Sequence, residues 1–274
     1  MFAREKSPCW EGRVRLPLAW ERARLAQAEE WCDVLDDDDD QWSRIRLQDY
    51  GPIFERPGLY EYIFHDLMEC DSPRRVIDLL DAVRVDLEVP ANQLRVLDLG
   101  AGNGIVAERL AGSGAAAIMG IDILRKAEEA ADRDRPGLYQ DYLVADLSSV
   151  STEARSRIVD FRPTALACVA ALGFGDIPTR VYMNALSFIP DGGLLAFNIK
   201  SAFLEPQYSY GFSLLIRRMV DEKVVRVEAM RRYRHRLGVD GKPLYYTAMI
   251  ATKLAALPEH FVREVEQSEH HRRV

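Results

Sequence analysis

The chain has 274 residues, of which 48% are hydrophobic and 29% charged, and its formal net charge is −7. This length fits one large α/β domain with an added segment, and the acidic balance argues against a protein that holds nucleic acid mainly through its phosphates. No apolar run reaches the roughly 18 residues of a membrane span, no apolar signal core opens the chain and no cysteine spacing indicates a metal site, so we expect a cytoplasmic protein without bound metal.

The first predicted unit, residues 1–48, is set apart by its tryptophans. All four tryptophans of the chain lie within the first 42 residues. Good helix formers fill 20–35 and place Trp20 and Trp31 near one face, which predicts a helix. The acidic run 36–40 opposes the dipole at the end of such a helix and is typical of a solvated linker. We expect this helical segment to act as a lid or as an interface in a homo-oligomer.

The second unit, residues 49–256, begins with two helical patterns and then alternates between strand and helix. Apolar residues at four-residue steps predict an amphipathic helix within 56–70, and Ser72-Pro73 is typical of the start of another. From residue 94 onward, β-prone runs alternate with helical stretches in five units. These are 94–99 with 104–113, 116–121 with 123–132, 142–145 with 152–161, 164–170 with 177–188, and 193–199 with 209–221.

Two longer β-prone runs follow, and Asp240-Gly241 between them is typical of a hairpin turn. The fold predicted from these patterns is α/β, with a doubly wound, mostly parallel, Rossmann-like sheet. It should have seven strands, of which the last two form a C-terminal antiparallel hairpin. Residues 257–274 are expected to form a final helix and tail.

A glycine-rich turn in the stretch VLDLGAGNGIVAERL follows the first strand of the parallel sheet. Such a turn lets a ligand approach bare backbone beside a helix N-terminus. The dinucleotide pattern GxGxxG/A needs Gly or Ala where Ile105 stands. The chain has D-x-G-x-G-x-G instead, beginning at Asp98. That carboxylate would repel a pyrophosphate and favour an ammonium or sulfonium group, and S-adenosylmethionine carries both.

Two further acids stand at the ends of predicted strands. Asp122 follows the second strand, where a carboxylate can accept hydrogen bonds from both hydroxyls of a ribose. Asp146 follows the third strand, where an acceptor suits the exocyclic amine of adenine. The apolar side chains next to them, Ile123 and Leu147, could sandwich the adenine ring. Because ligands of such sheets bind at the carboxyl ends of the strands, we expect all three acids to face one crevice.

At this point the sequence resembles a known family. VLDLGAGNGIVAERL, IMGIDI and YLVADL look like the successive cofactor motifs of class I S-adenosylmethionine-dependent methyltransferases, and the late hairpin follows that family's order. Within the family, the likeness is strongest to the methyltransferase-like group named after the Williams–Beuren syndrome region. The resemblance covers roughly residues 48–255, and it implies the activity and the cofactor but not the substrate.

The resemblance also implies a role for each matching position. The backbone of Gly100, Ala101 and Gly102 would pass along the methionine part of the cofactor, whose ammonium would lie near Asp98. Asp122 would hold the ribose, and the adenine amine would bind at the next acid along the chain. The remaining implied contacts, at the adenine, at the sulfonium and above the cofactor, are Asp146, Ile123, Leu147, Val169, Ala170 and Tyr50.

Methyl transfer from a sulfonium is an in-line displacement, in which the protein mainly aligns the acceptor and excludes water. A general base is needed where the acceptor is a hydroxyl or a protonated amine. The candidate bases are His65, Asp176 and His235, and nothing in the sequence selects one of them. Gly173-Phe174-Gly175 stands where relatives often place a polar or histidine residue, so no family base carries over there.

Three functions remain open from the sequence. The first is a methyltransferase that produces S-adenosylhomocysteine while methylating a small molecule at oxygen or nitrogen, which the acidic net charge favours. The second is a methyltransferase of protein or RNA that uses the basic cluster RRYRHR, where Arg232, Arg234 and Arg236 would share one face of a strand. The third is a module that binds S-adenosylmethionine without catalysis.

Overall fold

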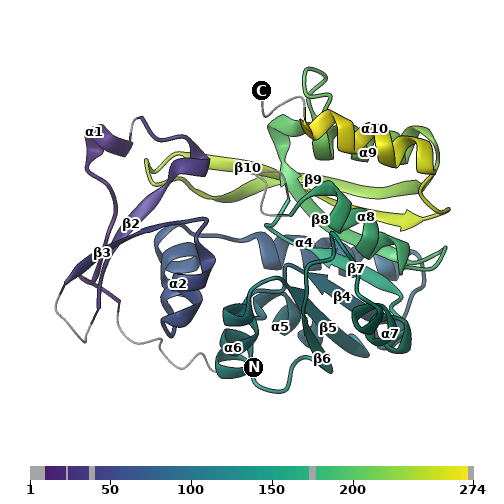
Figure 1. The fold of residues 1–274 in the computed structure, drawn as a ribbon, viewed down its shortest axis with the longest axis horizontal. Helices are drawn as coiled ribbons and strands as arrows, with labels where there is room; N and C mark the ends of the chain where they lie inside the picture. The colour runs from purple at the N-terminus through teal and green to yellow at the C-terminus, as the bar shows by residue number, and fades with distance from the viewer. Residues whose placement is uncertain (1–9, 23, 37–40, 173–176, 271–274) are drawn as a thin grey trace.

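The computed structural model describes residues 10–22, 24–36, 41–172 and 177–270. A seven-stranded sheet forms its centre, with the strand order β6-β5-β4-β7-β8-β10-β9 (Figure 1). The first five of these run parallel, and β10 is antiparallel to β8 and to β9. The strands are β4 (Arg95–Leu99), β5 (Ala117–Asp122), β6 (Asp141–Val144), β7 (Ala165–Cys168), β8 (Leu194–Lys200), β9 (Val225–Leu237) and β10 (Pro243–Lys253). The predicted sheet with its C-terminal hairpin is confirmed.

Helices cover both faces of this sheet, as expected of a doubly wound fold. Alternate strand residues face opposite sides, so that Leu97 belongs to one hydrophobic core and Val96 to the other. The helices on the Leu97 side are α7 (Thr152–Phe161), α8 (Thr179–Ser187), α9 (Gly211–Asp221) and α10 (Glu259–His270). Those on the Val96 side are α4 (Ser72–Asp86) and α5 (Ile105–Gly112), and α6 (Arg125–Asp134) packs its alanines against Tyr142.

In its described residues the N-terminal segment has more strand than helix, so the helix predicted over 20–35 is wrong. It forms a three-stranded antiparallel sheet of β1 (Val14–Arg15), β2 (Trp31–Leu35) and β3 (Trp42–Arg46). Among the described residues of this segment, the helical structure consists of α1 (Ala19–Arg22) and a 3₁₀ turn, η1 (Gln27–Glu29). Cys32 and Val34 are buried while their neighbours in β2 are not, which is the period of two that a half-buried strand requires. Tertiary packing therefore overrides the helix propensity of the alanines and glutamates.

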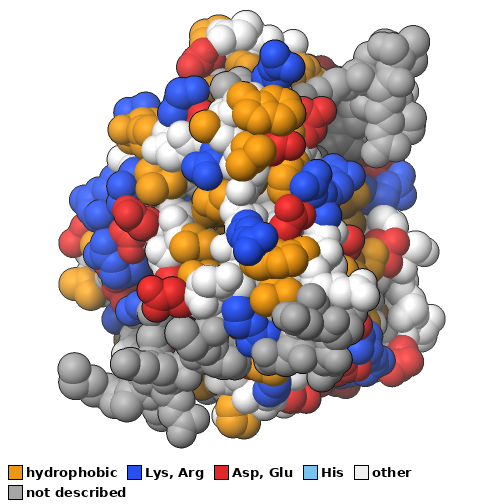
Figure 2. Space-filling model, turned by 90° about the vertical axis from the view of Figure 1, so that its left-hand side faces the viewer, with side chains coloured by type: hydrophobic (Ala, Val, Ile, Leu, Met, Phe, Trp, Pro, Cys, Tyr) orange, Lys and Arg blue, Asp and Glu red, His pale blue; other side chains and the backbone are white. Residues whose placement is uncertain are grey.

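The outer face of this small sheet joins arginines to tryptophans. The Arg44 guanidinium lies 3.3 Å from the ring centroid of Trp31, and that of Arg15 lies 3.6 Å from the ring centroid of Trp42. These cation–π contacts cover the indole rings with charged groups. Figure 2 views this side of the molecule and shows Lys and Arg side chains interspersed with hydrophobic ones.

Short helices connect the small sheet to the large one. They are α2 (Tyr50–Glu55), α3 (Leu59–Glu61) and the π-helical turn η2 (Tyr62–Leu67). The amphipathic helix predicted over 56–70 thus exists, but it is shorter and partly π-helical. Its apolar residues Leu59 and Ile63 are buried with Val34 and Ile45 of the small sheet. No helix in the described parts of the chain is long and apolar enough to cross a membrane.

The basic cluster on β9 does not form a stripe on one face. Arg232 and Arg234 are exposed, but Arg236 is only 4% exposed. The pairing of β9 with β10 shifts by one residue between these positions, and this bulge turns Arg236 inward. There its guanidinium Nη2 lies 2.5 Å from Glu30 Oε2, and Glu30 also accepts the backbone N–H of Val239. The pair fastens the N-terminal segment to the edge of the large sheet.

The replacement Glu30→Ala should destabilise the fold strongly, because it leaves the buried Arg236 charge without its partner. We expect the free energy of unfolding to fall by about 3–5 kcal/mol. Urea denaturation measures this loss. The matched control is Asp33→Ala, which breaks the exposed ion pair with Arg44 and should cost less than about 1 kcal/mol. Equal losses in the two variants would show that the buried pair is not an anchor.

Candidate functional site

A cavity of about 340 Å³ lies across the carboxyl ends of β6, β5, β4 and β7. This is the edge where ligands of parallel α/β sheets bind. Of the site residues predicted from the sequence, every one except Asp98 lines the cavity. They are Tyr50, Gly100, Ala101, Gly102, Asp122, Ile123, Asp146, Leu147, Val169 and Ala170. Residues that are far apart in the chain are thus brought together at one rim.

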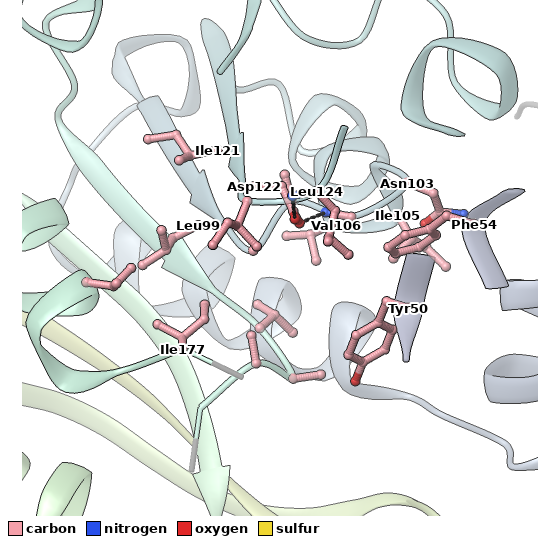
Figure 3. A pocket seen from close by; sticks show the side chains of 18 of the residues that line it. Tyr50, Phe54, Leu99, Asn103, Ile105, Val106, Ile121, Asp122, Leu124 and Ile177 are labelled. Carbon is pink, nitrogen blue, oxygen red and sulfur yellow. Dashed lines mark hydrogen bonds between the residues drawn. The ribbon is translucent and has the colours of Figure 1, made fainter. Parts of the chain in front are cut away.

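The glycine loop between β4 and α5 forms the floor of the cavity. Gly100 and Gly102 have φ values of 72° and 55°, which favour glycine. A Cβ on Gly100 would lie 3.1 Å from Ile177 Cδ1, and one on Gly102 would lie 3.2 Å from Phe54 Cζ. The backbone of the loop is therefore the surface that a ligand would meet. Figure 3 shows the side chains of Phe54 and Ile177 on either side of this part of the cavity.

Asp122, at the end of β5, ties the glycine loop to its own loop. Its two carboxylate oxygens each accept a backbone N–H at 3.0 Å, one from Gly102 and one from Leu124. Burial raises the pKa of this carboxyl, and the backbone N–H groups oppose that rise. Each oxygen keeps a further lone pair, so the carboxylate can still accept hydrogen bonds from a ligand.

Asp146, at the end of β6, is more exposed and is held by its own turn. Its oxygens accept the backbone N–H and the hydroxyl of Ser148, both at 2.7 Å. Of the two apolar residues predicted beside these acids, Leu147 is buried in the core and Ile123 is 63% exposed. An exposed isoleucine at the rim of a cavity offers a flat apolar ligand a surface to cover.

Asp98 does not line the cavity, so the expectation that all three acids face one crevice is wrong for this residue. Its side chain is 1% exposed and lies beside Tyr139, whose hydroxyl donates to Oδ2 at 2.9 Å. Oδ1 has no hydrogen-bond partner among the described residues. Burial raises the pKa of Asp98 to about 7, and the neighbouring charge of Asp122 adds to this. The Asp98 carboxyl group therefore supports the glycine loop from within the protein and does not reach the surface of the cavity.

Asp98 should make the protein less stable as the pH rises from about 4 to about 7. In this range the unfolded chain ionises the carboxyl while the folded protein keeps it protonated, so unfolding releases a proton. Asp98→Asn removes this titration. Its free energy of unfolding should therefore fall less between pH 5 and pH 8 than that of the wild type, by about 2 kcal/mol or more. Urea denaturation at the two pH values measures the difference, and parallel pH profiles would contradict it.

Several lining residues were not predicted from the sequence, among them Phe54, Tyr60 and Asn103. The Asn103 amide donates to Glu61 Oε1 at 2.7 Å, and Arg135 donates to the same oxygen at 2.8 Å and to the Asn103 carbonyl at 3.2 Å. These bonds join the glycine loop to α3 and to Arg135, the residue that follows α6. Asn103 occupies a variable position of the glycine motif, so the pattern carries no signal for it.

The aromatic residues of α2 and α3 form a wall above the glycine loop. The ring of Phe54 lies 6.0 Å from that of Tyr50 and 5.2 Å from that of Tyr60, centroid to centroid. The sequence predicts Tyr50 above a cofactor, and the helical step of four residues from 50 to 54 is the signal that would add Phe54 to it. This wall and the apolar rim of the parallel strands enclose the cavity from two sides.

The end of β7 is held in an unusual conformation. Ala170 has a φ of 62°, which costs a residue other than glycine about 1–2 kcal/mol. Its backbone N–H donates to Asn198 Oδ1 at 2.6 Å, and the Asn198 amide in turn donates to Tyr233 Oη at 2.7 Å and Ser72 Oγ at 3.1 Å. A buried polar network thus sets the shape of one cavity wall.

The charges on the cavity wall are all negative. Among the described residues that line it, Asp122 and Asp146 carry charge and no Lys or Arg is present. No group of three or more His, Cys, Asp or Glu within the described ranges is arranged to hold a metal. Two carboxylates and a bare backbone loop fit a ligand that is neutral or cationic better than an anionic one.

No protein-family model matches this chain, and no curated protein sequence matches it. Solved structures resemble it in fold at low identity. A magnesium protoporphyrin IX methyltransferase from Synechocystis PCC 6803 with bound S-adenosylmethionine has a TM-score of 0.44 and 18% identity, covering 65% of this chain and 78% of its own. An N-methyltransferase from Bradyrhizobium japonicum in complex with S-adenosylhomocysteine has a TM-score of 0.42 and 14% identity, covering 58% and 76%. A ribosomal protein L11 methylase from Lactobacillus delbrueckii subsp. bulgaricus has a TM-score of 0.41 and 15% identity, covering 58% and 69%.

Proposed function

We propose that this protein is an S-adenosylmethionine-dependent methyltransferase that acts on a small molecule at oxygen or nitrogen. The observation that carries the proposal is the cavity itself, which unites Asp122, Asp146 and the glycine backbone and has no Lys or Arg in its described wall. A dinucleotide would place its pyrophosphate against carboxylates without a compensating cation, whereas a cationic nucleoside would be attracted to them. The likeness to the Williams–Beuren methyltransferase-like group stays part of this proposal.

The residues of the cavity fit the parts of such a cofactor. Asp122 would accept hydrogen bonds from the ribose hydroxyls with its remaining lone pairs, while Gly102 and Leu124 keep it in place. Asp146 would accept the adenine amine, and the exposed side chain of Ile123 would cover the adenine ring. The backbone of 100–102 would follow the methionine part. Asp98 would act on the cofactor only through the loop above it.

When bound, S-adenosylmethionine supplies a methyl group on a positively charged sulfur. The protein then has to orient an acceptor in line with that bond and keep water away. Val169 and Ala170, at the end of β7, line the wall next to the glycine loop, and Tyr50 and Phe54 cover it from α2. These uncharged groups would form a dry surface around the transferred methyl.

The two alternative functions are affected differently by the structure. A protein or RNA methyltransferase that uses the arginine cluster loses its main support, because Arg236 is buried against Glu30. A module that binds the cofactor without catalysis differs from an enzyme only in whether S-adenosylhomocysteine forms when an acceptor is present. We further propose a cytoplasmic location, and a homo-oligomer that would use the outer face of the N-terminal sheet.

The first test is direct binding. Isothermal titration should show S-adenosylmethionine and S-adenosylhomocysteine binding more tightly than NAD, because the acids in the cavity repel a pyrophosphate and attract a cation. Tighter binding of NAD than of either compound would refute the proposed cofactor.

The second test is the replacement Asp122→Ala. It should weaken binding of S-adenosylmethionine by about tenfold or more, which is about 1.4 kcal/mol, since the ribose loses its acceptor and the glycine loop loses a hydrogen bond. Asp160→Ala is the matched control, because it removes the same charge from an exposed site on α7. Equal affinities of the two variants would show that the ribose is held elsewhere.

A further inference from the structure

The cavity wall at the end of β7 contains a strained residue. Of the described residues other than glycine that have a left-handed φ, Ala170 is the one that lines the cavity. Its φ of 62° is a conformation that an alanine leaves unless its surroundings hold it there. The shape of this part of the wall therefore depends on the group that holds Ala170.

The conformation of Ala170 also decides how the chain meets the glycine loop. A Cβ on Gly100 would lie 3.2 Å from the Cβ of Ala171, the next residue along the chain. Leu172 then forms an isolated bridge with Ile177, whose Cδ1 would lie 3.1 Å from the same Cβ on Gly100. Because the two backbone dihedrals of Ala170 set the direction in which the chain leaves β7, they also set how this wall packs on the floor of the cavity.

The Asn198 side chain, on β8, holds Ala170 by its backbone. It is fully buried, and its Oδ1 accepts the Ala170 N–H at 2.6 Å. Since a backbone N–H only donates, this bond identifies the amide oxygen and fixes the orientation of the amide. The amide nitrogen then donates to Ser72 Oγ at 3.1 Å and to Tyr233 Oη at 2.7 Å.

Asn198 thereby joins two separate parts of the cavity wall. Ser72 is the first residue of α4, and its neighbour Pro73 lines the cavity together with Cys70. The end of β7 and the start of α4 are thus bonded to opposite ends of one amide group. An amide group is short and planar, so the spacing between these two parts of the wall is fixed by a single side chain.

The same network contains His235, one of the three candidate bases named from the sequence. Its Nδ1 lies 2.6 Å from Ser72 Oγ, and its side chain is 5% exposed and does not line the cavity. Burial holds the pKa of His235 well below the usual range, so this histidine is a neutral part of the core. Of the other two candidates, Asp176 lies outside the described residues and His65 lines the cavity.

We propose that Asn198 is a positioning residue for the methyl transfer, because it keeps Ala170 in the conformation that the bound cofactor requires. This inference rests on the proposed function, in which the end of β7 borders the transferred methyl. Without the Asn198 oxygen, the folded protein would favour a relaxed Ala170, and the cofactor would bind only the fraction of molecules that keep the left-handed conformation. The replacement Ala170→Gly removes the cost of that conformation, so it should make the bond from Asn198 unnecessary.

The first experiment is a double-mutant cycle on affinity. Asn198→Ser keeps a hydroxyl for Ser72 and Tyr233 but is too short to accept the Ala170 N–H. Isothermal titration should show that this variant binds S-adenosylmethionine about 5- to 30-fold more weakly than the wild type, which is the affinity equivalent of the strain in a left-handed alanine. Adding Ala170→Gly should restore the affinity to within about threefold of the wild type. Asn198→Thr, which leaves a smaller void, replaces Asn198→Ser if that variant does not fold.

The matched control is Arg162→Gly. Arg162 has a φ of 52° and is exposed at the end of α7, so its replacement removes the same kind of strain away from the cavity. Combined with Asn198→Ser, it should leave binding of S-adenosylmethionine weak. Equal recovery with Arg162→Gly and with Ala170→Gly would show that Asn198 only stabilises the fold. That result, or an unchanged affinity in Asn198→Ser, would overturn the inference.

The second experiment needs no ligand and compares midpoints of urea denaturation. Ala170→Gly should shift the midpoint more favourably in the wild type than in Asn198→Ser, because only the wild type holds position 170 in the left-handed conformation. Equal shifts in the two backgrounds would contradict the proposed role of Asn198. Failure of the wild type to bind S-adenosylmethionine would refute the proposed function, while the urea midpoints would still decide whether Asn198 holds Ala170.

Discussion

The carboxylate of Asp122 is the interaction on which the site depends most directly. It accepts one backbone N–H from the glycine loop after β4 and one from the loop after β5. The backbone N–H groups of Gly100 and Ala101 also bond to the Ile121 carbonyl at the end of β5, and the Asp122 carboxylate extends this connection to Gly102, where a glycine-rich turn has many conformations to choose from. Because each oxygen accepts one of these N–H groups at 3.0 Å, the positions of the two loops relative to each other are fixed. The carboxylate therefore builds the floor of the cavity as well as offering lone pairs to a ligand.

The large sheet could be predicted well from the sequence because its signals are local. Each strand is a short β-prone run, each helix has an apolar period, and Asp240-Gly241 marks the hairpin. The positions of Asp122 and Asp146 followed from their places at strand ends. The N-terminal segment could not be predicted in this way, because Cys32, Val34 and Ile45 are buried against distant residues, and this contact decides the structure against helix propensity.

The predicted positions of two charged side chains are wrong for the same physical reason. Asp98 and Arg236 are charged residue types on strands, and their spacing placed them at a ligand site and on an exposed face. In the structure each is buried by a partner from elsewhere in the chain, Tyr139 for the aspartate and Glu30 for the arginine. A periodic pattern predicts which face of its strand a side chain lies on. It does not predict where a bulge will reverse that face, nor which distant residue will form a hydrogen bond with a buried polar group.

The left-handed conformation of Ala170 links the cavity wall to the body of the protein. Asn198 on β8 holds that residue by its backbone, and the same amide is bonded to the first residue of α4 and to β9. The strand end, the helix start and the outer hairpin thus move as one unit. A displacement of α4 would therefore be transmitted through Asn198 to the peptide of Ala170, so the shape of this cavity wall depends on the packing of a helix on the Val96 side of the sheet.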